Sequence, residues 1–395
     1  MNGMIKHVSI SSVDDWGAAC LFGVEQAERA RAFHAGLPSY SPTALRRLSG
    51  LAEGLGLGAV FVKDESTRFG LNAFKGLGGS YCVARLLADR AGVSESELTF
   101  ARLQREDVRQ IANDLTLVTA TDGNHGRGIA WTARELGCKA VVYMPKGSSS
   151  ERLGNIRALG AQAEITELNY DDTVRLAARR AQEHGWELVQ DTAWEGYEEI
   201  PTRIMQGYTT LALESVEQLD GEIPTHVILQ AGVGAMSGAV AAFFADRFRE
   251  ARPTVVVVEP NAADCVYRTA VANDGELRKV EGDLGTIMAG LSCGEPCTVG
   301  WEMLRRYADH FLSVPDEIAE KGMRILARPV SGDAPIVSGE SGAVTIGILA
   351  ELMENEQLAE LREAIGLGPD SKVLCISTEG DTDRESYSRI VYGIQ

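Results

Sequence analysis

Short apolar runs alternate with amphipathic stretches along this chain, and that rhythm limits the possible folds more than any other feature of the sequence. The apolar runs are AVFVKDE, LTLVTATDGN and CKAVVYMP in the first half and HVILQAGVG, TVVVVEP and KVLCIST in the second. Strands that alternate with helices predict a parallel sheet covered by helices. No repeat of fixed period is visible, which argues against a solenoid. The sequence therefore predicts an α/β fold.

The length and the spacing of these runs predict two domains. A chain of 395 residues buries about three quarters of its extended surface on folding, enough for two cores. Three strand and helix units precede the second series of strands, which indicates an insertion. We predict a large domain of residues 1–79 and 197–395 and a smaller inserted domain of residues 80–196, each with a mostly parallel, twisted sheet flanked by helices. The polar segment 93–114 should be a helical insertion at the surface.

The charge of the chain restricts its partners. With 38 basic and 56 acidic residues, the formal net charge is −18. The resulting field repels polyanions, so nucleic acid and anionic membranes are poor partners. No apolar run reaches the roughly 18 to 20 residues that span a bilayer, and the first residues, MNGMIKHVSISSVDDW, lack the apolar core of a signal peptide. We therefore expect a cytoplasmic protein.

The seven cysteines are scattered and odd in number, which is typical of reduced thiols. Cys293 and Cys297 lie close together, but no second pair of cysteines or histidines follows at metal-ligand spacing. We expect no metal site. A disulfide between Cys265 and one of these two cysteines stays open.

Lys75 is the first candidate for chemistry. In the segment NAFKGLGG it follows an aromatic residue, Phe74, and precedes small residues at the start of a helix. Partial desolvation of such a lysine favours the neutral amine, which can form a Schiff base. Most lysines are surface charges, so the motif alone leaves both interpretations open.

The segment TATDGNHG forms a turn between a predicted strand and a predicted helix. Such a turn presents unpaired backbone N–H groups to an anion, and its glycines allow a ligand to approach closely. The candidate ligand contacts are Thr121, Asp122, Gly123, Asn124 and His125. The alternatives are a helix cap made by Asp122 or Asn124 and a purely structural role for His125.

A glycine-rich loop follows the strand HVILQ and precedes an apolar helix. Its residues are Gly232, Val233, Gly234, Ala235 and Met236, with Gly238 two positions later. A loop of this kind at a helix N-terminus can cradle a phosphate. The alternative is a dinucleotide site with Glu259 as the ribose acid, although the spacing GxGxxxG differs from GxGxxG. The loop alone does not decide between the two.

Taken in order, six segments resemble the fold-type-II pyridoxal-phosphate enzymes, the group of threonine dehydratase, cysteine synthase and tryptophan synthase β. They are KDESTRFGLNAFK, TATDGNHGRGIAWTA, LQAGVGAMSGA, VVVVEP, ESGA and STEGD, and they span roughly residues 35–385. The resemblance implies pyridoxal 5'-phosphate as the cofactor and a small amino acid as the substrate.

The same resemblance implies a role for each site residue. Lys75 would bind the cofactor through a Schiff base, and Phe74 would pack on the pyridine ring. Asn124 would hydrogen-bond the ring hydroxyl, residues 232–236 would wrap the phosphate, and Thr378 would face the pyridine nitrogen. A hydroxyl leaves that nitrogen largely unprotonated, which suits β-elimination and replacement rather than transamination.

Asp122, the insertion at 93–114 and the segment VQDTAWEGYEEIP resemble the diaminopropionate ammonia-lyases. That family converts D- and L-2,3-diaminopropionate into pyruvate and two molecules of ammonia. The resemblance implies a carboxylate that holds the substrate's β-ammonium, either Asp122 or Asp191, although Asp191 is equally well explained as a helix N-cap.

Two further functions stay open. One is a serine/threonine dehydratase of the same fold, and the other is a nicotinamide-dependent oxidoreductase that uses the glycine loop. The resemblance also implies a homodimer, and residues 1–34 have no obvious partner among the core motifs.

Asp122 is predicted to remove the α-hydrogen of the D isomer, because that hydrogen points away from Lys75. Replacing it (Asp122→Asn) should lower turnover of D-diaminopropionate by roughly 10²- to 10⁴-fold, as expected for a lost general base. Turnover of the L isomer should fall less, because Lys75 acts on that face. Pyruvate release from each isomer measures both rates. An equal fall for both isomers, with unchanged cofactor binding, would make Asp122 an ammonium-holding or structural residue.

Overall fold

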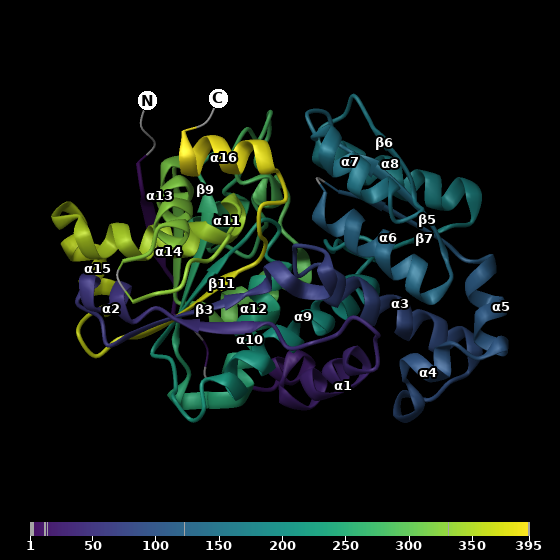
Figure 1. The fold of residues 1–395 in the computed structure, drawn as a ribbon, viewed down its shortest axis with the longest axis horizontal. Coiled ribbons are helices and arrows are strands. Elements are labelled where there is room, and N and C mark those ends of the chain that lie inside the picture. Colours follow the sequence, from purple (N-terminus) through teal and green to yellow (C-terminus); the bar gives the residue numbers. More distant parts are fainter. Residues whose placement is uncertain (1–3, 12, 14, 122, 331, 394–395) are drawn as a thin grey trace.

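The computed structural model describes residues 4–11, 13, 15–121, 123–330 and 332–393 (Figure 1). Asp122 therefore lies outside the described residues. The described chain forms two separate sheets, and helices pack against each of them. None of its helices is both long enough and apolar enough to cross a membrane.

The larger sheet is mostly parallel, with the strand order β1-β10-β9-β8-β11-β3-β2. Its parallel strands are β3 (Ala59–Asp64), β8 (His226–Gln230), β9 (Thr254–Pro260), β10 (His310–Val314) and β11 (Lys372–Ser377). The antiparallel edge strands are β1 (Lys6–Ser9) and β2 (Ala44–Arg47). Four of the parallel strands were predicted from apolar runs, whereas β1, β2 and β10 were not. The two edge strands are short and partly polar, which gives them little apolar pattern.

Both faces of the larger sheet are buried, because successive side chains of a strand point to opposite faces. In β9, Val255 and Val257 belong to one apolar cluster, and Val256 and Val258 belong to the other. The first cluster includes α1 (Val24–Ala35), α9 (Glu199–Gln218), α10 (Ala235–Phe248), α11 (Cys265–Ala272) and α12 (Thr298–Tyr307). The second includes α2 (Ser49–Leu55), α13 (Asp316–Ala327), α14 (Glu340–Glu354), α15 (Ala359–Ile365) and α16 (Arg384–Tyr392).

The smaller sheet is entirely parallel in the described chain. Its order is β6-β5-β4-β7, with β4 (Thr116–Ala120), β5 (Lys139–Met144), β6 (Gln162–Ile165) and β7 (Glu187–Leu188). Around it lie α3 (Gly76–Ala91), α6 (Asn124–Leu136), α7 (Ser150–Arg157) and α8 (Tyr170–His184). All four strands fall within 80–196, but α3 crosses the predicted boundary at residue 79 and packs against both α6 and α9. The division into domains at these residues stays a prediction.

The segment 93–114 is helical, as predicted, but part of it belongs to the core. It contains η3 (Glu95–Glu97), α4 (Phe100–Leu103) and α5 (Glu106–Asp114). Leu103, Val108 and Ala112 are buried in the larger apolar cluster. The expectation of a purely surface insertion is wrong for these residues, and the i, i+4 spacing of Val108 and Ala112 was the signal for it.

The N-terminal segment also has partners within the chain. Strand β1 pairs with β10, and α1 packs against α9. The argument that residues 1–34 lack a partner is therefore wrong, and it no longer supports a dimer.

A fully buried ionic cluster connects β3, the segment that leads to Lys75, and α9. The carboxylate of Glu214 accepts hydrogen bonds from Lys63 Nζ and from Arg68 Nη2, each at 2.7 Å. Arg68 Nη2 also donates to Glu65 at 2.8 Å, and all four side chains are at most 1% exposed. Burial opposes ionisation of Glu214, but Arg68 and Lys63 lower its pKa from 4.5 to about 2.

Replacing Glu214 by Gln should lower the free energy of unfolding at neutral pH by about 3 to 5 kcal/mol, because two cations would stay buried with too little counter-charge. Urea denaturation measures the loss. The matched control is Glu217→Gln, which removes a partly exposed ion pair with Arg31 and should cost less than about 1 kcal/mol.

The difference between wild type and Glu214→Gln should also depend on pH. A carboxyl whose pKa is lowered by folding stabilises the fold above its unfolded pKa and loses this contribution as the pH falls. The difference should therefore be full above pH 4.5 and shrink towards pH 2. A difference that is constant over this range would contradict the assigned role of Glu214.

Candidate active site

A cavity lies between the two sheets, where the carboxyl ends of their parallel strands meet. It receives residues that follow β3, β4, β7, β8 and β11. The lining residues with candidate roles are Phe74, Lys75, Thr121, Asn124, His125, Asp191, Gly232, Val233, Gly234, Ala235, Met236 and Thr378. Strand ends are the usual ligand sites of α/β sheets.

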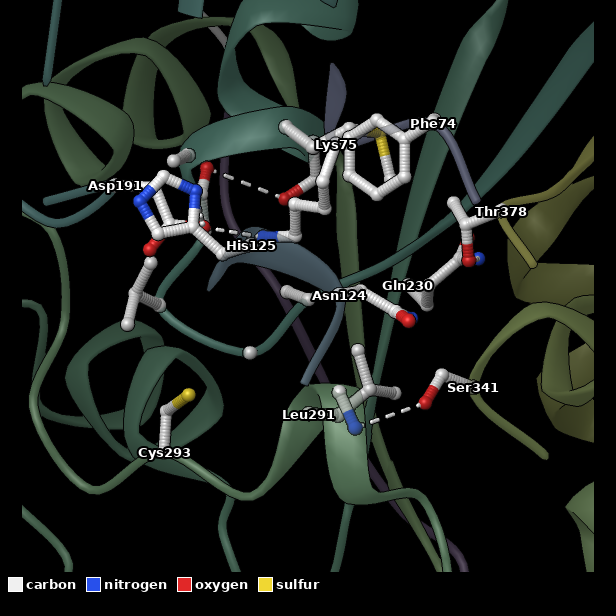
Figure 2. A pocket seen from close by; sticks show the side chains of 18 of the residues that line it. Phe74, Lys75, Asn124, His125, Asp191, Gln230, Leu291, Cys293, Ser341 and Thr378 are labelled. Atoms are coloured by element: carbon white, nitrogen blue, oxygen red, sulfur yellow. Dashed lines mark hydrogen bonds and ion pairs between the residues drawn. The ribbon is translucent and has the colours of Figure 1, made fainter. Parts of the chain in front are cut away.

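Lys75 lies at the start of α3 and points into the cavity (Figure 2). Its ammonium group forms an ion pair with the carboxylate of Asp191. The lysine Nζ lies 5.2 Å from the centre of the Phe74 ring and 5.8 Å from that of Tyr208. The aromatic neighbours therefore partly desolvate this lysine, whose side chain is 20% exposed.

Asp191 follows β7 and is almost fully buried beside His125. No helix begins at Asp191, since α9 starts at Glu199, so the N-cap interpretation is wrong. His125 Nε2 lies 2.8 Å from the Val189 carbonyl, and a carbonyl only accepts, so this nitrogen carries the hydrogen. His125 Nδ1 then faces Asp191 Oδ2 at 3.6 Å.

The ionisation states of this pair follow from burial and charge. Burial lowers the pKa of His125 despite the nearby carboxylate. Burial also opposes ionisation of Asp191, but its interactions with His125 and Lys75 lower its pKa below the ordinary value. At neutral pH the site therefore holds a neutral imidazole and a carboxylate.

The turn that ends β4 is held by its own hydrogen bonds. Thr121 Oγ1 accepts the N–H of Gly123 at 2.9 Å, and Gly123 has the positive φ of 153° that favours glycine. Asn124 is the first residue of α6 rather than its cap, and its amide donates to the carboxylate of Glu379.

The glycine loop lies between β8 and the N-terminus of α10. The first N–H groups of a helix have no acceptor within it, so they are available to an anion. A side chain at Gly232 would bring its Cβ to 3.2 Å from the Gly290 carbonyl and 3.3 Å from Cys293 Sγ. The third glycine of the pattern, Gly238, instead allows α10 to pack closely on Gly300 of α12.

Glu259 is not a ribose ligand. Its side chain is buried, and its carboxylate accepts the N–H groups of Val266 and Tyr267 in the first turn of α11. The dinucleotide interpretation of the glycine loop is therefore wrong.

Thr378 follows β11 and is fixed by two hydrogen bonds. Its hydroxyl accepts from Gln230 Nε2 at 2.8 Å, and its carbonyl accepts from the N–H of Phe74 at 3.1 Å. Among the described residues, Gln230 Oε1 is buried without a hydrogen-bond partner. A bound group that donates to this oxygen would remove the penalty of an unpaired acceptor.

Sequence reasoning missed the contributions of Gln230, Glu379 and Ser341. Glu379 accepts the N–H of Ser341 at 3.2 Å in addition to the Asn124 amide. Glu379 lies in the motif STEGD and Ser341 lies in the motif ESGA, but the sequence alone assigned no role to either side chain. The available signal was their position at a strand end and at a helix start.

The seven cysteines form no disulfide with one another in the structure. Cys265 Sγ donates to the Gly232 carbonyl at 3.6 Å, and Cys293 lines the cavity. The disulfide left open by the sequence is therefore not formed.

These features fit pyridoxal phosphate. Lys75 offers an amine beside an aromatic ring, and the helix N-terminus with its glycine loop offers N–H groups to a phosphate. Gly232 keeps that cradle open, and Gln230, which ends β8 just before the loop, has an unpaired acceptor oxygen. A family model described as "Pyridoxal-phosphate dependent enzyme" matches residues 37–379. The chain belongs to this family.

This pyridoxal-phosphate dependent enzyme has close relatives. Diaminopropionate ammonia-lyase of Salmonella typhimurium LT2 is 54% identical over 365 residues, 91% of this chain and 90% of that protein. Its Escherichia coli K12 counterpart is 51% identical over 374 residues, 94% and 92% of the two chains. The crystal structure of the Escherichia coli enzyme in complex with D-serine is similar at a TM-score of 0.92 and 47% identity, covering 99% of this chain and 98% of that chain.

These similarities place the enzyme among the diaminopropionate ammonia-lyases. They confirm both resemblances that were drawn from the sequence. They also confirm the predicted fold class and the predicted cofactor.

Replacing Gly232 by Ala should weaken binding of pyridoxal phosphate. The added methyl group would press on the backbone at Gly290 and on Cys293, and overpacking of this kind costs about 1 to 3 kcal/mol, or roughly a 5- to 150-fold change in Kd. Titration of the cofactor-free protein, followed by absorbance, measures Kd. Gly54→Ala is the control, because no atom lies within 4 Å of its added Cβ. Equal affinities in the two variants would contradict the assigned phosphate cradle.

Proposed function

We propose that this enzyme catalyses the pyridoxal-phosphate dependent α,β-elimination of D- and L-2,3-diaminopropionate, with water, to pyruvate and two molecules of ammonia. The observation that carries the proposal is the buried, ionised carboxylate of Asp191 beside Lys75, in a cavity that fits the cofactor. The relatives that match most of its length are named for this activity.

The substrate carries one charge more than serine or threonine, a β-ammonium group. A buried carboxylate is a costly feature unless it is paired with a cation. Asp191 is paired with Lys75 here, and we infer that the substrate's ammonium takes the place of Lys75 as its partner. A hydroxyamino acid would leave this carboxylate without a cation, which favours diaminopropionate over serine.

The turn at Thr121, Gly123 and His125 is proposed to bind the substrate's carboxylate. Asn124 stands in the first turn of α6, where N–H groups without an acceptor in the helix and the helix dipole favour an anion. The substrate's two opposite charges would thus be held by two different groups, which fixes its orientation.

Proton transfer is assigned to the chain's own residues. When bound, pyridoxal phosphate supplies an electron sink for the pair left at the substrate's α carbon. Lys75 is proposed to hold the cofactor through its amine and to remove the α-hydrogen of the L isomer after the substrate displaces it. On sequence grounds alone, Asp122 is proposed as the base for the D isomer. Asn124, residues 232–236 and Thr378 are proposed to contact the cofactor, and Phe74 to pack against it.

The assay that tests the function compares pyruvate release from D- and L-diaminopropionate, serine and threonine. We expect the highest kcat/KM for diaminopropionate. Asp191→Asn should lower kcat/KM for diaminopropionate by about 10- to 150-fold, because a charge-assisted contact of about 1.5 to 3 kcal/mol is lost. The value for serine should fall less.

Asp107→Asn on the exposed side of α5 serves as the control for this assay, and it should leave all four substrates unaffected. A kcat/KM for serine or threonine equal to or above that for diaminopropionate would make the enzyme a dehydratase. An equal fall for serine and diaminopropionate in Asp191→Asn would contradict the ammonium contact.

We also propose a homodimer, on the resemblance to the fold-type-II enzymes alone. Light scattering at micromolar concentration should then give about twice the chain mass of 42.5 kDa. A mass equal to that of one chain would contradict this proposal.

A further inference from the structure

Tyr208 places an unpaired hydroxyl next to the cofactor lysine. This tyrosine of α9 is fully buried, and within the described part of the chain its hydroxyl has no hydrogen-bond partner. A buried hydroxyl without a partner destabilises a fold, and phenylalanine would fill the same space without that penalty. An unpaired group of this kind, beside reacting residues, calls for a functional explanation.

The position of Tyr208 results from a close helix crossing. An added Cβ at Gly207 of α9 would lie 2.5 Å from the Leu77 carbonyl of α3, and one at Gly78 would lie 2.5 Å from Tyr208 Cε1. Only glycine at both positions allows the two helices to approach this closely. The Tyr208 ring is therefore pressed against the beginning of α3, where Lys75 lies.

The surroundings of Tyr208 include both aromatic and charged groups of the site. Its ring centre lies 4.7 Å from that of Phe74, and Lys75 Nζ lies 5.8 Å from its ring centre. Burial raises the pKa of the Tyr208 phenol, while the charge of Lys75 and a polar contact between the two side chains, which falls short of a formed hydrogen bond, act in the opposite direction. The phenol is thus neutral at working pH and can both donate and accept a hydrogen bond.

The proposed function changes the partners of Lys75 during turnover. The lysine amine is paired with Asp191 in this structure, but the substrate's ammonium would occupy Asp191. We propose that the Tyr208 hydroxyl is a positioning group that then accepts an N–H of the Lys75 amine and directs its lone pair to the α-hydrogen of the L isomer. This inference rests on the proposed function and extends it to a residue outside the cavity lining.

The test compares Tyr208→Phe with Tyr307→Phe in the holoenzyme. Tyr307 is also fully buried, but its hydroxyl donates to the Asp15 carbonyl at 2.7 Å, and α12 does not line the cavity. Turnover of L-diaminopropionate should fall about tenfold or more in Tyr208→Phe, as expected for one lost hydrogen bond to an amine, and turnover of the D isomer should fall less. Tyr307→Phe should leave both rates unchanged.

Two further measurements separate positioning from packing. With α-deuterated L-diaminopropionate, the kinetic isotope effect on kcat should rise in Tyr208→Phe, because proton removal becomes slower relative to the other steps. The melting temperature of cofactor-free Tyr208→Phe should equal or exceed that of wild type, since an unpaired hydroxyl is removed. A lower melting temperature together with equal losses for both isomers would identify Tyr208 as a packing residue.

The outcomes also distinguish this inference from the function on which it rests. A wild-type enzyme that releases no pyruvate from either isomer would refute the proposed function and this inference with it. An active wild type whose L-isomer rate and isotope effect are unchanged by Tyr208→Phe would refute the role of Tyr208 alone.

Discussion

The close backbone contact of α3 with both α6 and α9 is the constraint on which the site depends. A Cβ at Gly128 of α6 would lie 3.0 Å from the Gly76 nitrogen, and a Cβ at Gly207 of α9 would lie 2.5 Å from the Leu77 carbonyl. Helix α3 is thereby held between the helices of the smaller sheet and those of the larger one, with Lys75 at its N-terminus. Any displacement of this helix would move the lysine away from Asp191, which follows β7.

The electrostatics of the site follow from the same geometry. Asp191 is taken out of water by burial and still ionised, because a cation lies against it. Such a carboxylate selects for whichever cation can replace Lys75. The glycine loop favours an anion instead. A helix N-terminus with unpaired N–H groups attracts an anion even where no lysine or arginine is present. The two ends of the cavity therefore have opposite preferences, although the chain as a whole is strongly acidic.

The apolar runs of the sequence were sufficient to predict four of the five parallel strands of the larger sheet and the loops after them, because buried parallel strands are apolar on both faces. The fifth parallel strand, β10, was missed although it is buried. The edge strands β1 and β2 were missed because they are short and partly polar. Sequence alone left Asp191 between a site residue and a helix cap, since only the start of α9 at Glu199 excludes a cap. Tyr208 and Gln230 carried no local signal at all, because their roles arise from contacts between distant segments.

The strand order of the larger sheet has a consequence for synthesis on the ribosome. Strand β11 lies between β8 and β3 and is the last strand to be translated. Strands β3 and β8 lack the strand that lies between them until Lys372–Ser377 has left the ribosome. Strand β1 likewise lacks its pairing partner until β10 has been synthesised. The smaller sheet is complete once Leu188 has emerged. The larger sheet therefore cannot be completed before β11 has been synthesised, and unpaired apolar strands of this kind favour aggregation.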